Sequence, residues 1–251
     1  MSYEKERAEA LLRRAEELVE ESRKTDYRMN IVIPFIPTIF IVIGAIILFI
    51  GLFTLFIEFQ AGISMLGTGF AIIIIGFIIN LYVIYKWVER RNEHFRRTLS
   101  LFETIAELAE VLKFRRSYAI KSRLNEFREV NSRMRSALAN AILTIVPFYV
   151  YYVYHFLNKD FVSHSEKEKL LLIEIFDELR ERLPGFTRRV EEFATVPDRS
   201  TFLYIILTIV TGFFILYWVY TLTKDPNKHF ESHGIIEREL IAAFREILTK
   251  L

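Results

Sequence analysis

The chain has 251 residues, of which 52% are hydrophobic and 25% charged, and its formal net charge is +2. That hydrophobic share, with a positive mean hydropathy, excludes an ordinary soluble globular protein. The small net charge gives no support for nucleic acid as a partner, and the absence of cysteine excludes disulfides and thiolate chemistry. Glutamine occurs once while Ile, Glu, Arg and Lys are abundant, a balance that resembles thermophile usage.

The N-terminal residues 1–30 predict an amphipathic helix. Ala8, Leu11, Ala15 and Leu18 recur at helical spacing between Glu and Arg residues. This charged start differs from a short basic stretch followed by a cleavage site, so no cleaved signal peptide is expected.

Four runs without Asp, Glu, Lys or Arg follow: Met29–Ile57, Phe59–Tyr85, Ser136–Asn158 and Ser200–Thr223. Each reaches the roughly 20 residues that an apolar helix needs to cross a bilayer. They predict an all-α polytopic membrane protein with four membrane segments. Pro147 and the Thr211-Gly212 pair lie inside the last two runs, where they could instead turn a shallow re-entrant helix.

The segments between these runs carry amphipathic stripes whose apolar faces need a partner in the chain, in another subunit or in the lipid interface. The predicted order is an N-terminal amphipathic helix (1–30), a transmembrane hairpin (31–88), a cytoplasmic helical segment (89–138), a third membrane segment (139–158), an amphipathic helix and loop (159–199), a fourth membrane segment (200–223) and a C-terminal amphipathic helix (224–251).

Positive residues place both termini in the cytoplasm of a multi-pass protein of the cell membrane. Residues 1–30 carry seven Lys or Arg and residues 86–135 carry thirteen, while the turn near Glu58 carries none. A conflict follows, because four crossings put residues 159–199, with eight Lys or Arg, on the outside.

An internal repeat aligns Asn92 and His94 with Asn227 and His229 at an offset of 135 residues. A third copy aligns Asp160 and His164 with Asp225 and His229. The unit is a membrane segment, a Tyr-rich exit, a polar hinge and an amphipathic helix, with the last helix expected to begin at Asp225-Pro226. The hinge residues are Asn92, His94, Asp160, His164, Asp225, Asn227 and His229. With four crossings, His164 would face the opposite side from the other two histidines.

The stretch Gly212–Trp218, followed by Tyr220, Asp225 and Asn227, resembles the membrane family called domain of unknown function 4234. That family's pattern is Thr-x-Gly-x-Tyr-x-x-Tyr-Trp followed by Asp-x-Asn. Here Val210 stands where the Thr is expected, and Phe214 replaces the first Tyr. The likeness covers roughly residues 206–235, with a weaker copy at 142–164, and implies membrane residence without a known activity.

His229 and His233 are spaced i, i+4, which places both imidazoles on one helix face and could hold zinc with one or two more ligands. The alternative is a pair of histidines at the membrane–water boundary. The lack of an HExxH motif favours the boundary interpretation. Neither a metal nor a cofactor is expected.

A basic cluster directly follows the second membrane segment and is expected to contact anionic lipid headgroups, at about 1 kcal/mol per charge. Positive-inside topology alone also accounts for it. The cluster consists of Lys86, Arg90, Arg91, Arg96 and Arg97.

The uncharged runs hold no Asp, Glu, Lys or Arg and, of the histidines, only His155. The sequence shows no serine elbow or phosphate loop. These features argue against an enzyme and against an ion-coupled carrier. The expected function is a non-catalytic membrane scaffold or organising protein that self-associates through amphipathic helices, with membrane lipids, further copies of the chain or another membrane protein as partners. The alternatives are an oligomeric channel or transporter subunit and an accessory subunit of a larger membrane complex.

Overall fold

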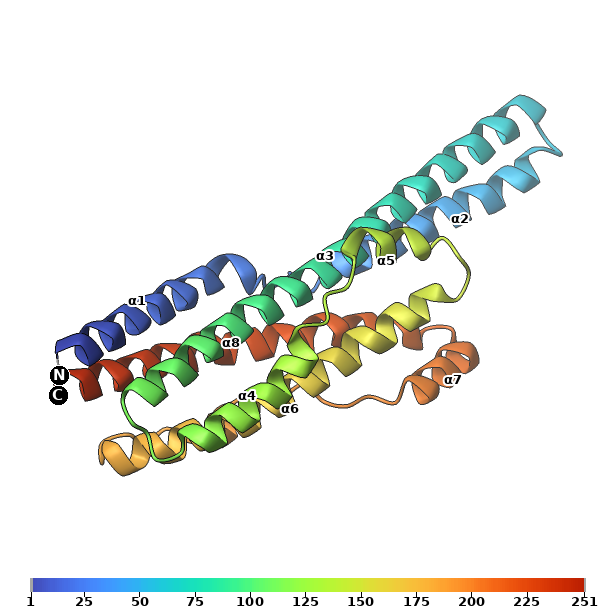
Figure 1. Ribbon diagram of the computed structural model, residues 1–251. Helices are drawn as coiled ribbons and strands as arrows, with labels where there is room; N and C mark the ends of the chain where they lie inside the picture. The colour runs from blue at the N-terminus through green and yellow to red at the C-terminus, as the bar shows by residue number, and fades with distance from the viewer. Residues whose placement is uncertain (1, 251) are drawn as a thin grey trace.

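The computed structural model describes residues 2–250 and is built from helices over that range. Met1 and Leu251, the outer ends of the first and last predicted segments, lie outside the described residues. The predicted all-α class is confirmed. The elements in Figure 1 are α1 (Ser2–Thr25), η1 (Ile33–Phe35), α2 (Ile36–Thr54), α3 (Phe59–Val111), α4 (Ser117–Asn131), α5 (Ala137–Leu143), α6 (Tyr149–Arg182), η2 (Val190–Glu192), α7 (Thr201–Thr211) and α8 (Phe214–Thr249).

Three long helices, α3, α6 and α8, define the molecule, and each follows a shorter apolar helix and a tight turn. The pairs are α2 with α3, α5 with α6, and α7 with α8. α1 packs on α3 and α8, while α4 packs on α3 and α6. The repeated sequence therefore corresponds to three structural units of the same order, a short apolar helix followed by a long helix that becomes charged.

The amphipathic stripes of α1, α3, α4, α6 and α8 meet in one hydrophobic core. Leu101, Ile105, Leu171, Ile175 and Phe244 are fully buried there. Burial of such side chains contributes roughly 1.5–3 kcal/mol each. The partner that each stripe required is thus supplied within the chain, which removes the argument for self-association that rested on unpaired stripes.

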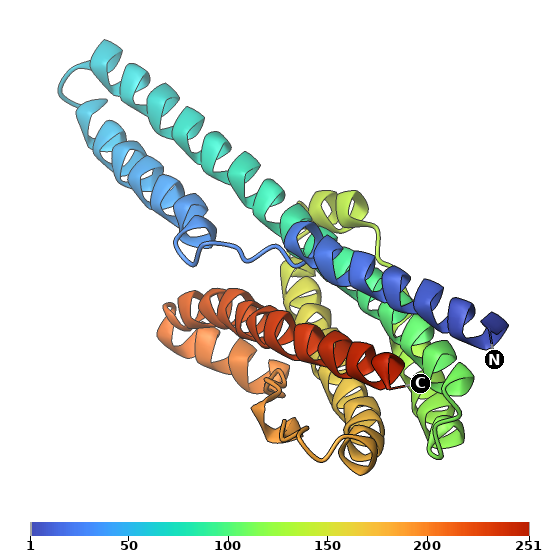
Figure 2. The ribbon, with the colours of Figure 1, turned by 90° about the vertical axis from the view of Figure 1, so that its left-hand side faces the viewer.

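The α2–α3 hairpin projects beyond this bundle (Figure 2). Among the described residues it supplies two helices long and apolar enough to cross a membrane, Ile33–Thr54 and Phe59–Val111. The large apolar side chains of α2, and those of α3 before Val83, are exposed or half-buried, unlike those of a core helix in a soluble protein. Close approach depends on small residues, since a Cβ on Gly44 would lie 2.7 Å from the carbonyl oxygen of Gly69.

The prediction of four membrane segments is not confirmed, because the third and fourth uncharged runs each break into a helical hairpin. The third turns at Phe148, whose φ is 68°, directly after Pro147, and the fourth turns at Gly212, whose φ is 70°. At about 1.5 Å per residue, α5 and α7 are only about 10 and 16 Å long, short of a bilayer core of about 30 Å.

The predicted start of the last helix at Asp225-Pro226 is wrong, because α8 runs through Pro226 without a break. Proline lacks the N–H that would bind the carbonyl oxygen of Leu222 four residues earlier. Arg90 Nη2 donates to that oxygen at 2.8 Å instead. Similarly, α3 continues past residue 88 to Val111 and α6 continues past residue 158 to Arg182, so these predicted segment boundaries fall inside helices.

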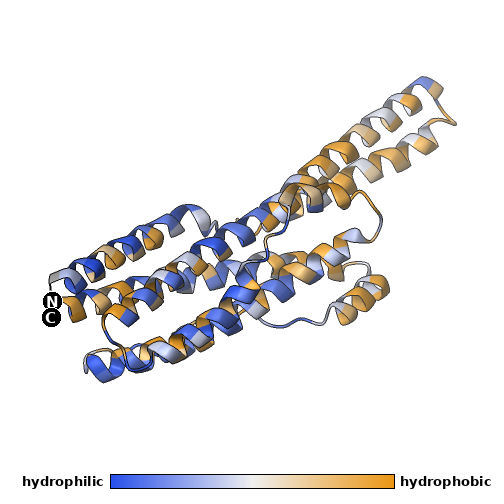
Figure 3. Ribbon diagram, in the orientation of Figure 1, coloured by the Kyte–Doolittle hydropathy of each residue, from blue (hydrophilic) through white to orange (hydrophobic). Residues whose placement is uncertain are grey.

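Apolar residues gather at one end of the molecule and charged residues at the other (Figure 3). The apolar end holds the α2–α3 hairpin together with α5 and α7. The histidines of the repeat lie on the long helices beyond this end, where the sequence has become polar.

Candidate metal centre

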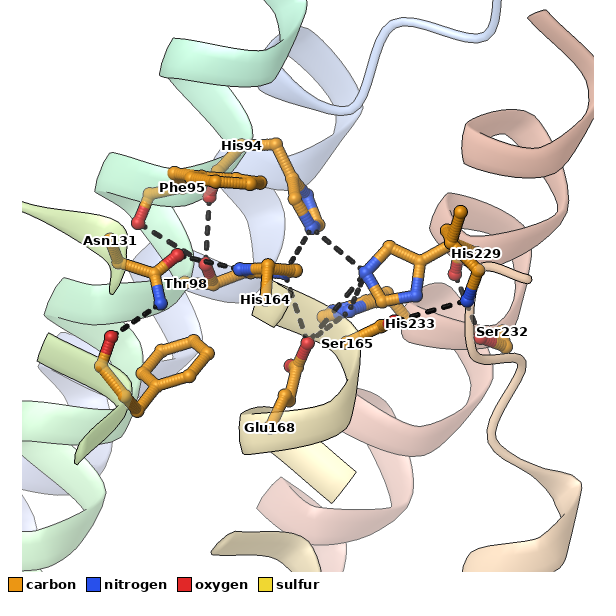
Figure 4. Close-up of polar contacts among 12 residues, drawn as sticks. His94, Phe95, Thr98, Asn131, His164, Ser165, Glu168, His229, Ser232 and His233 are labelled. Atoms are coloured by element: carbon orange, nitrogen blue, oxygen red, sulfur yellow. Dashed lines mark hydrogen bonds and ion pairs between the residues drawn. The ribbon is translucent and has the colours of Figure 1, made fainter. Parts of the chain in front are cut away.

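Five buried side chains converge between the three long helices (Figure 4). His94 comes from α3, His164 and Glu168 from α6, and His229 and His233 from α8. One donor atom from each lies within 4.8 Å of all the others, and each residue is almost completely inaccessible to solvent. Imidazole nitrogens and carboxylate oxygens are ligands of first-row transition metals.

Two of the three helices each contribute a pair of these ligands, spaced four residues apart. Glu168 follows His164 by four residues, and His233 follows His229 by four, so each pair lies on one helix face. On α3 the corresponding position is Thr98, whose hydroxyl donates to the backbone of its own helix. The three units therefore contribute a common layer of histidines and a second layer in which only α6 and α8 provide donors.

The separations between donor atoms are those of ligands around one ion. His94 Nε2 lies 3.1 Å from His164 Nε2 and 3.3 Å from His229 Nε2, and His233 Nε2 lies 3.2 Å from His229 Nε2. Glu168 Oε2 lies 3.0, 3.1 and 3.7 Å from the Nε2 atoms of His233, His164 and His229. For metal–ligand bonds of about 2.1 Å these six separations subtend angles of about 90–125°, within the range found between neighbouring ligands of one ion.

The other ring nitrogen of every histidine meets an acceptor outside the centre. Nδ1 lies 2.9 Å from Asp26 Oδ1 in His94, 2.5 Å from Asn131 Oδ1 in His164, 2.8 Å from the Ala194 carbonyl oxygen in His229 and 2.9 Å from Glu237 Oε1 in His233. An Nδ1–H donates to each of these oxygens. This assignment leaves the Nε2 lone pairs directed at the common point, an outer-sphere arrangement typical of metal-bound histidine.

In this tautomer the two Nε2 atoms of His94 and His164 have no proton between them. Two lone pairs 3.1 Å apart in a buried site repel each other, and an interposed cation converts that repulsion into attraction. Glu168 also indicates a bound cation, because its Oε1 atom is buried with no hydrogen-bond partner among the described residues.

Protonation in the metal-free protein follows from burial and neighbouring charge. Burial and the adjacent histidines hold the pKa of His94 and His229 well below the usual range, and burial lowers the pKa of His164. Burial alone would lower the pKa of His233, but Glu168 and Glu237 raise it to about 10. Three imidazoles are therefore neutral and ready to coordinate, whereas His233 must lose a proton first.

The buried charges around the centre do not balance without a cation. Arg97 bridges two outer carboxylates, with Nη2 2.8 Å from Asp26 Oδ2 and Nη1 2.7 Å from Glu237 Oε1. Glu168 adds a third carboxylate against this single guanidinium. When the imidazoles are neutral the group carries a net charge of −2, which a divalent ion neutralises.

The structure brings the three repeat histidines, His94, His164 and His229, together with His233. The other predicted hinge residues lie inside continuous helices, so they are not hinges. Asp160 pairs with Arg135, and Asp225 pairs with Arg199.

Asparagines of the long helices link each unit to the next. Asn92 on α3 bonds the backbone N and O of Arg135 before α5, Asn158 on α6 bonds the backbone N of Arg199 before α7, and Asn227 on α8 bonds the carbonyl oxygen of Met29 before α2. This cyclic order closes the three units around the histidines.

Most of the basic cluster expected at lipid headgroups is inside the protein. Arg90, Arg91 and Arg97 are at most 3% exposed. Arg91 pairs with Asp160 and Arg97 with the outer carboxylates, so these side chains are not available to lipid. Arg96 is exposed, and Lys86 pairs with Glu89.

Sequence reasoning missed Glu168, Asp26, Asn131 and Glu237. Glu168 had a usable signal, since its spacing from His164 equals that between His229 and His233. Glu237 had the same signal, because it follows His233 by four residues on α8. Asp26 and Asn131 had none, because they reach the histidines from other segments of the chain.

Comparison with protein-family models, with curated proteins and with solved structures found no match to this chain. The resemblance to domain of unknown function 4234 therefore stays an expectation.

Proposed function

We propose that this protein is a membrane-anchored metalloprotein in which one divalent transition-metal ion ties together three helical units. The observation that carries the proposal is the convergence of four imidazole Nε2 atoms and one carboxylate oxygen, each imidazole being held by an outer acceptor. The outer acceptors come from Asp26 after α1, from α4, from the segment between η2 and α7, and from α8. A centre of this kind links α3, α6 and α8.

The number and type of ligands favour iron(II) over zinc. Structural zinc sites have about four ligands in a tetrahedron. Five donors exceed a tetrahedral set, and their mixture of imidazole and carboxylate is compatible with iron(II). The net charge of the surrounding groups favours a divalent over a monovalent ion.

The proposed role is non-catalytic. Catalytic metal sites keep an open position for water or substrate. Here five protein ligands surround the site, and each of them is fully buried. A metal held in this way stabilises the bundle and fixes the mutual positions of the three units, which is consistent with an organising function at the membrane.

The membrane anchor is the α2–α3 hairpin, with both termini on the cytoplasmic side. The exposed apolar side chains of these helices support this placement, as do the positive charges that precede α2 and follow residue 85 of α3. The metal centre would then lie in the polar bundle on the cytoplasmic side of the anchor.

Metal analysis of protein purified without a histidine tag and under anaerobic conditions tests the proposal. We expect about one equivalent of metal per chain, mostly iron, and its loss in a His164→Ala/His229→Ala variant. His155→Ala is the matched control, because His155 is the remaining histidine and bonds Thr201 outside the centre. Metal-free wild-type protein after iron(II) addition, or equal metal content in both variants, would contradict the proposal.

A further inference from the structure

Two short apolar hairpins remain beside the α2–α3 anchor. One consists of α5, a turn and the first residues of α6, and the other of α7, a turn and the first residues of α8. Their tips expose large apolar side chains, including Phe148 and Phe213, each 79% accessible. Both hairpins lie at the same apolar end of the molecule as the anchor (Figure 3). This exposed surface is therefore continuous with the region proposed to enter lipid.

Local hydrogen bonds pair several backbone groups in the turns of these hairpins. In the first, Ile145 N–H donates to Ile142 O and Val146 N–H donates to Leu143 O. In the second, Thr211 Oγ1 accepts the Phe214 N–H at 3.0 Å. Hydrocarbon excludes turns with unpaired backbone groups. These local hydrogen bonds reduce the number of unpaired groups that the turns would bring into lipid.

The hairpins are too short to cross. α5 and α7 measure about 10 and 16 Å, roughly a third to a half of a hydrocarbon core of about 30 Å. α2, with 19 residues, is about 28 Å long. Within residues 2–250, only the α2–α3 hairpin has the length to reach the far side.

Charged residues lie where each short hairpin joins the rest of the bundle. Its base carries an ion pair, Arg135 with Asp160 in the first and Arg199 with Asp225 in the second. Residues 136–158 and 200–223 contain no Asp, Glu, Lys or Arg. Beyond the ion pairs, α6 and α8 continue to the histidines that they share with α3. All three units therefore approach the centre from the same apolar end.

We propose that the α5–α6 and α7–α8 hairpins insert into a single lipid leaflet, the one nearer the histidine centre, and end near the middle of the bilayer. Residues 159–199 then stay on the side of the termini, where their eight Lys or Arg agree with the positive-inside rule. The inserted volume is unequal, since one leaflet receives three hairpins and the other receives only the end of α2–α3. The protein is thus a one-sided wedge in lipid.

This inference rests on the membrane anchor of the proposed function and is independent of the metal. Single cysteines introduced into the cysteine-free chain test it by reaction with a membrane-impermeant maleimide, in intact cells and in inverted vesicles. The positions are Lys5 in α1, Phe56 at the α2–α3 turn, Glu181 in α6, and Val146 and Phe213 at the short tips. All five are accessible on the surface of the chain.

We expect Lys5→Cys and Glu181→Cys to react from one side and Phe56→Cys from the other. Val146→Cys and Phe213→Cys should react from neither side, and a fluorophore attached through a permeant reagent should be quenched more by nitroxide lipids labelled near the chain ends than by those labelled near the headgroups. Circular dichroism of each variant checks that the helices are retained.

The outcomes separate the two proposals. If Glu181→Cys reacts from the same side as Phe56→Cys while Lys5→Cys reacts from the other, the segments cross fully and the leaflet proposal fails alone. Free reaction of Val146→Cys and Phe213→Cys from the aqueous phase would overturn it as well. If Phe56→Cys reacts from the side of Lys5→Cys, the anchor itself is wrong.

Discussion

The two halves of α3 show opposite ways of holding helices together. From Phe59 to Tyr85 the helix pairs with α2, exposes large apolar residues such as Ile78, and turns glycines toward its neighbour. From Arg90 to Val111 it buries residues such as Leu101 and Ile105 and exposes charge. The first half suits a solvent as apolar as the side chains, where close packing replaces the hydrophobic effect. The second suits water, where apolar burial provides the main stabilisation.

Removal of the metal should give the largest difference between the two halves: it should destabilise the bundle and leave the α2–α3 hairpin unchanged. A metal bound at about 1,000 times its Kd stabilises the folded state by about 4 kcal/mol. We therefore expect a chelator to lower the thermal midpoint of the bundle substantially, measured by circular dichroism in detergent. The α2–α3 spacing, measured between spin labels at Ile46→Cys and Ile75→Cys, should be unchanged. Equal midpoints with and without metal would show that the bundle does not depend on it.

Truncation of core aromatics should have an effect of similar size. Phe176→Ala or Phe244→Ala leaves a cavity in a fully buried core and should lower the free energy of unfolding by about 3–5 kcal/mol. Phe49→Ala on the exposed face of α2 is the matched control, with an expected effect within about 0.5 kcal/mol. Denaturant titration in detergent measures both. Similar losses at Phe49 and Phe244 would remove the distinction between the two halves.

Enlarging one glycine should disturb the hairpin and spare the bundle. The added Cβ in Gly69→Ala would lie 2.8 Å from the Gly44 carbonyl oxygen and 2.9 Å from Leu48 N, and overpacking of this kind costs about 1–3 kcal/mol. Gly67→Ala, with no heavy atom within 4 Å of its Cβ, is the control. The Ile46–Ile75 label distance should lengthen or broaden in Gly69→Ala alone, while metal content stays equal in both.

Lowering the pH should have the smallest of these effects. It should weaken metal binding by about tenfold, or 1.4 kcal/mol, per pH unit. Since the pKa of His233 is about 10 in the metal-free protein, binding at pH 7 must release its proton. Titration with metal in weak buffer should therefore detect about one proton per ion, in wild type and in His155→Ala. Metal uptake without proton release would contradict this.

The raised pKa of His233 also makes the stability of the metal-free protein depend on pH. Stability contributed by protonated His233 is fully present below the pKa of an unfolded histidine, about 6.5, and is lost as the pH rises through about 10. Metal-free bundle should accordingly be less stable at pH 10 than at pH 7, and addition of metal should reduce that difference. Thermal unfolding at the two pH values measures the effect.

Much of the architecture could be predicted from the local sequence pattern. The alternation of uncharged runs and amphipathic stripes predicted the helices, the α2–α3 hairpin and the repeated units, because the helix period and hydropathy act over a few residues. The same pattern predicted crossings for Ser136–Asn158 and Ser200–Thr223. Composition measures apolar length and does not distinguish one spanning helix from two short ones joined at Phe148 or Gly212.

What the sequence by itself determined is an all-α chain with an apolar hairpin, three related units and a histidine in each. Only the tertiary structure decided that those histidines meet, that Glu168 completes their set and that Arg90, Arg91 and Arg97 are internal. The physical reason is range. Helix period and hydropathy are set by neighbours along the chain. His164 and His229 lie 70 and 135 residues after His94, so the three histidines come together only when their helices are fixed by shared packing and by Nδ1 contacts from further segments.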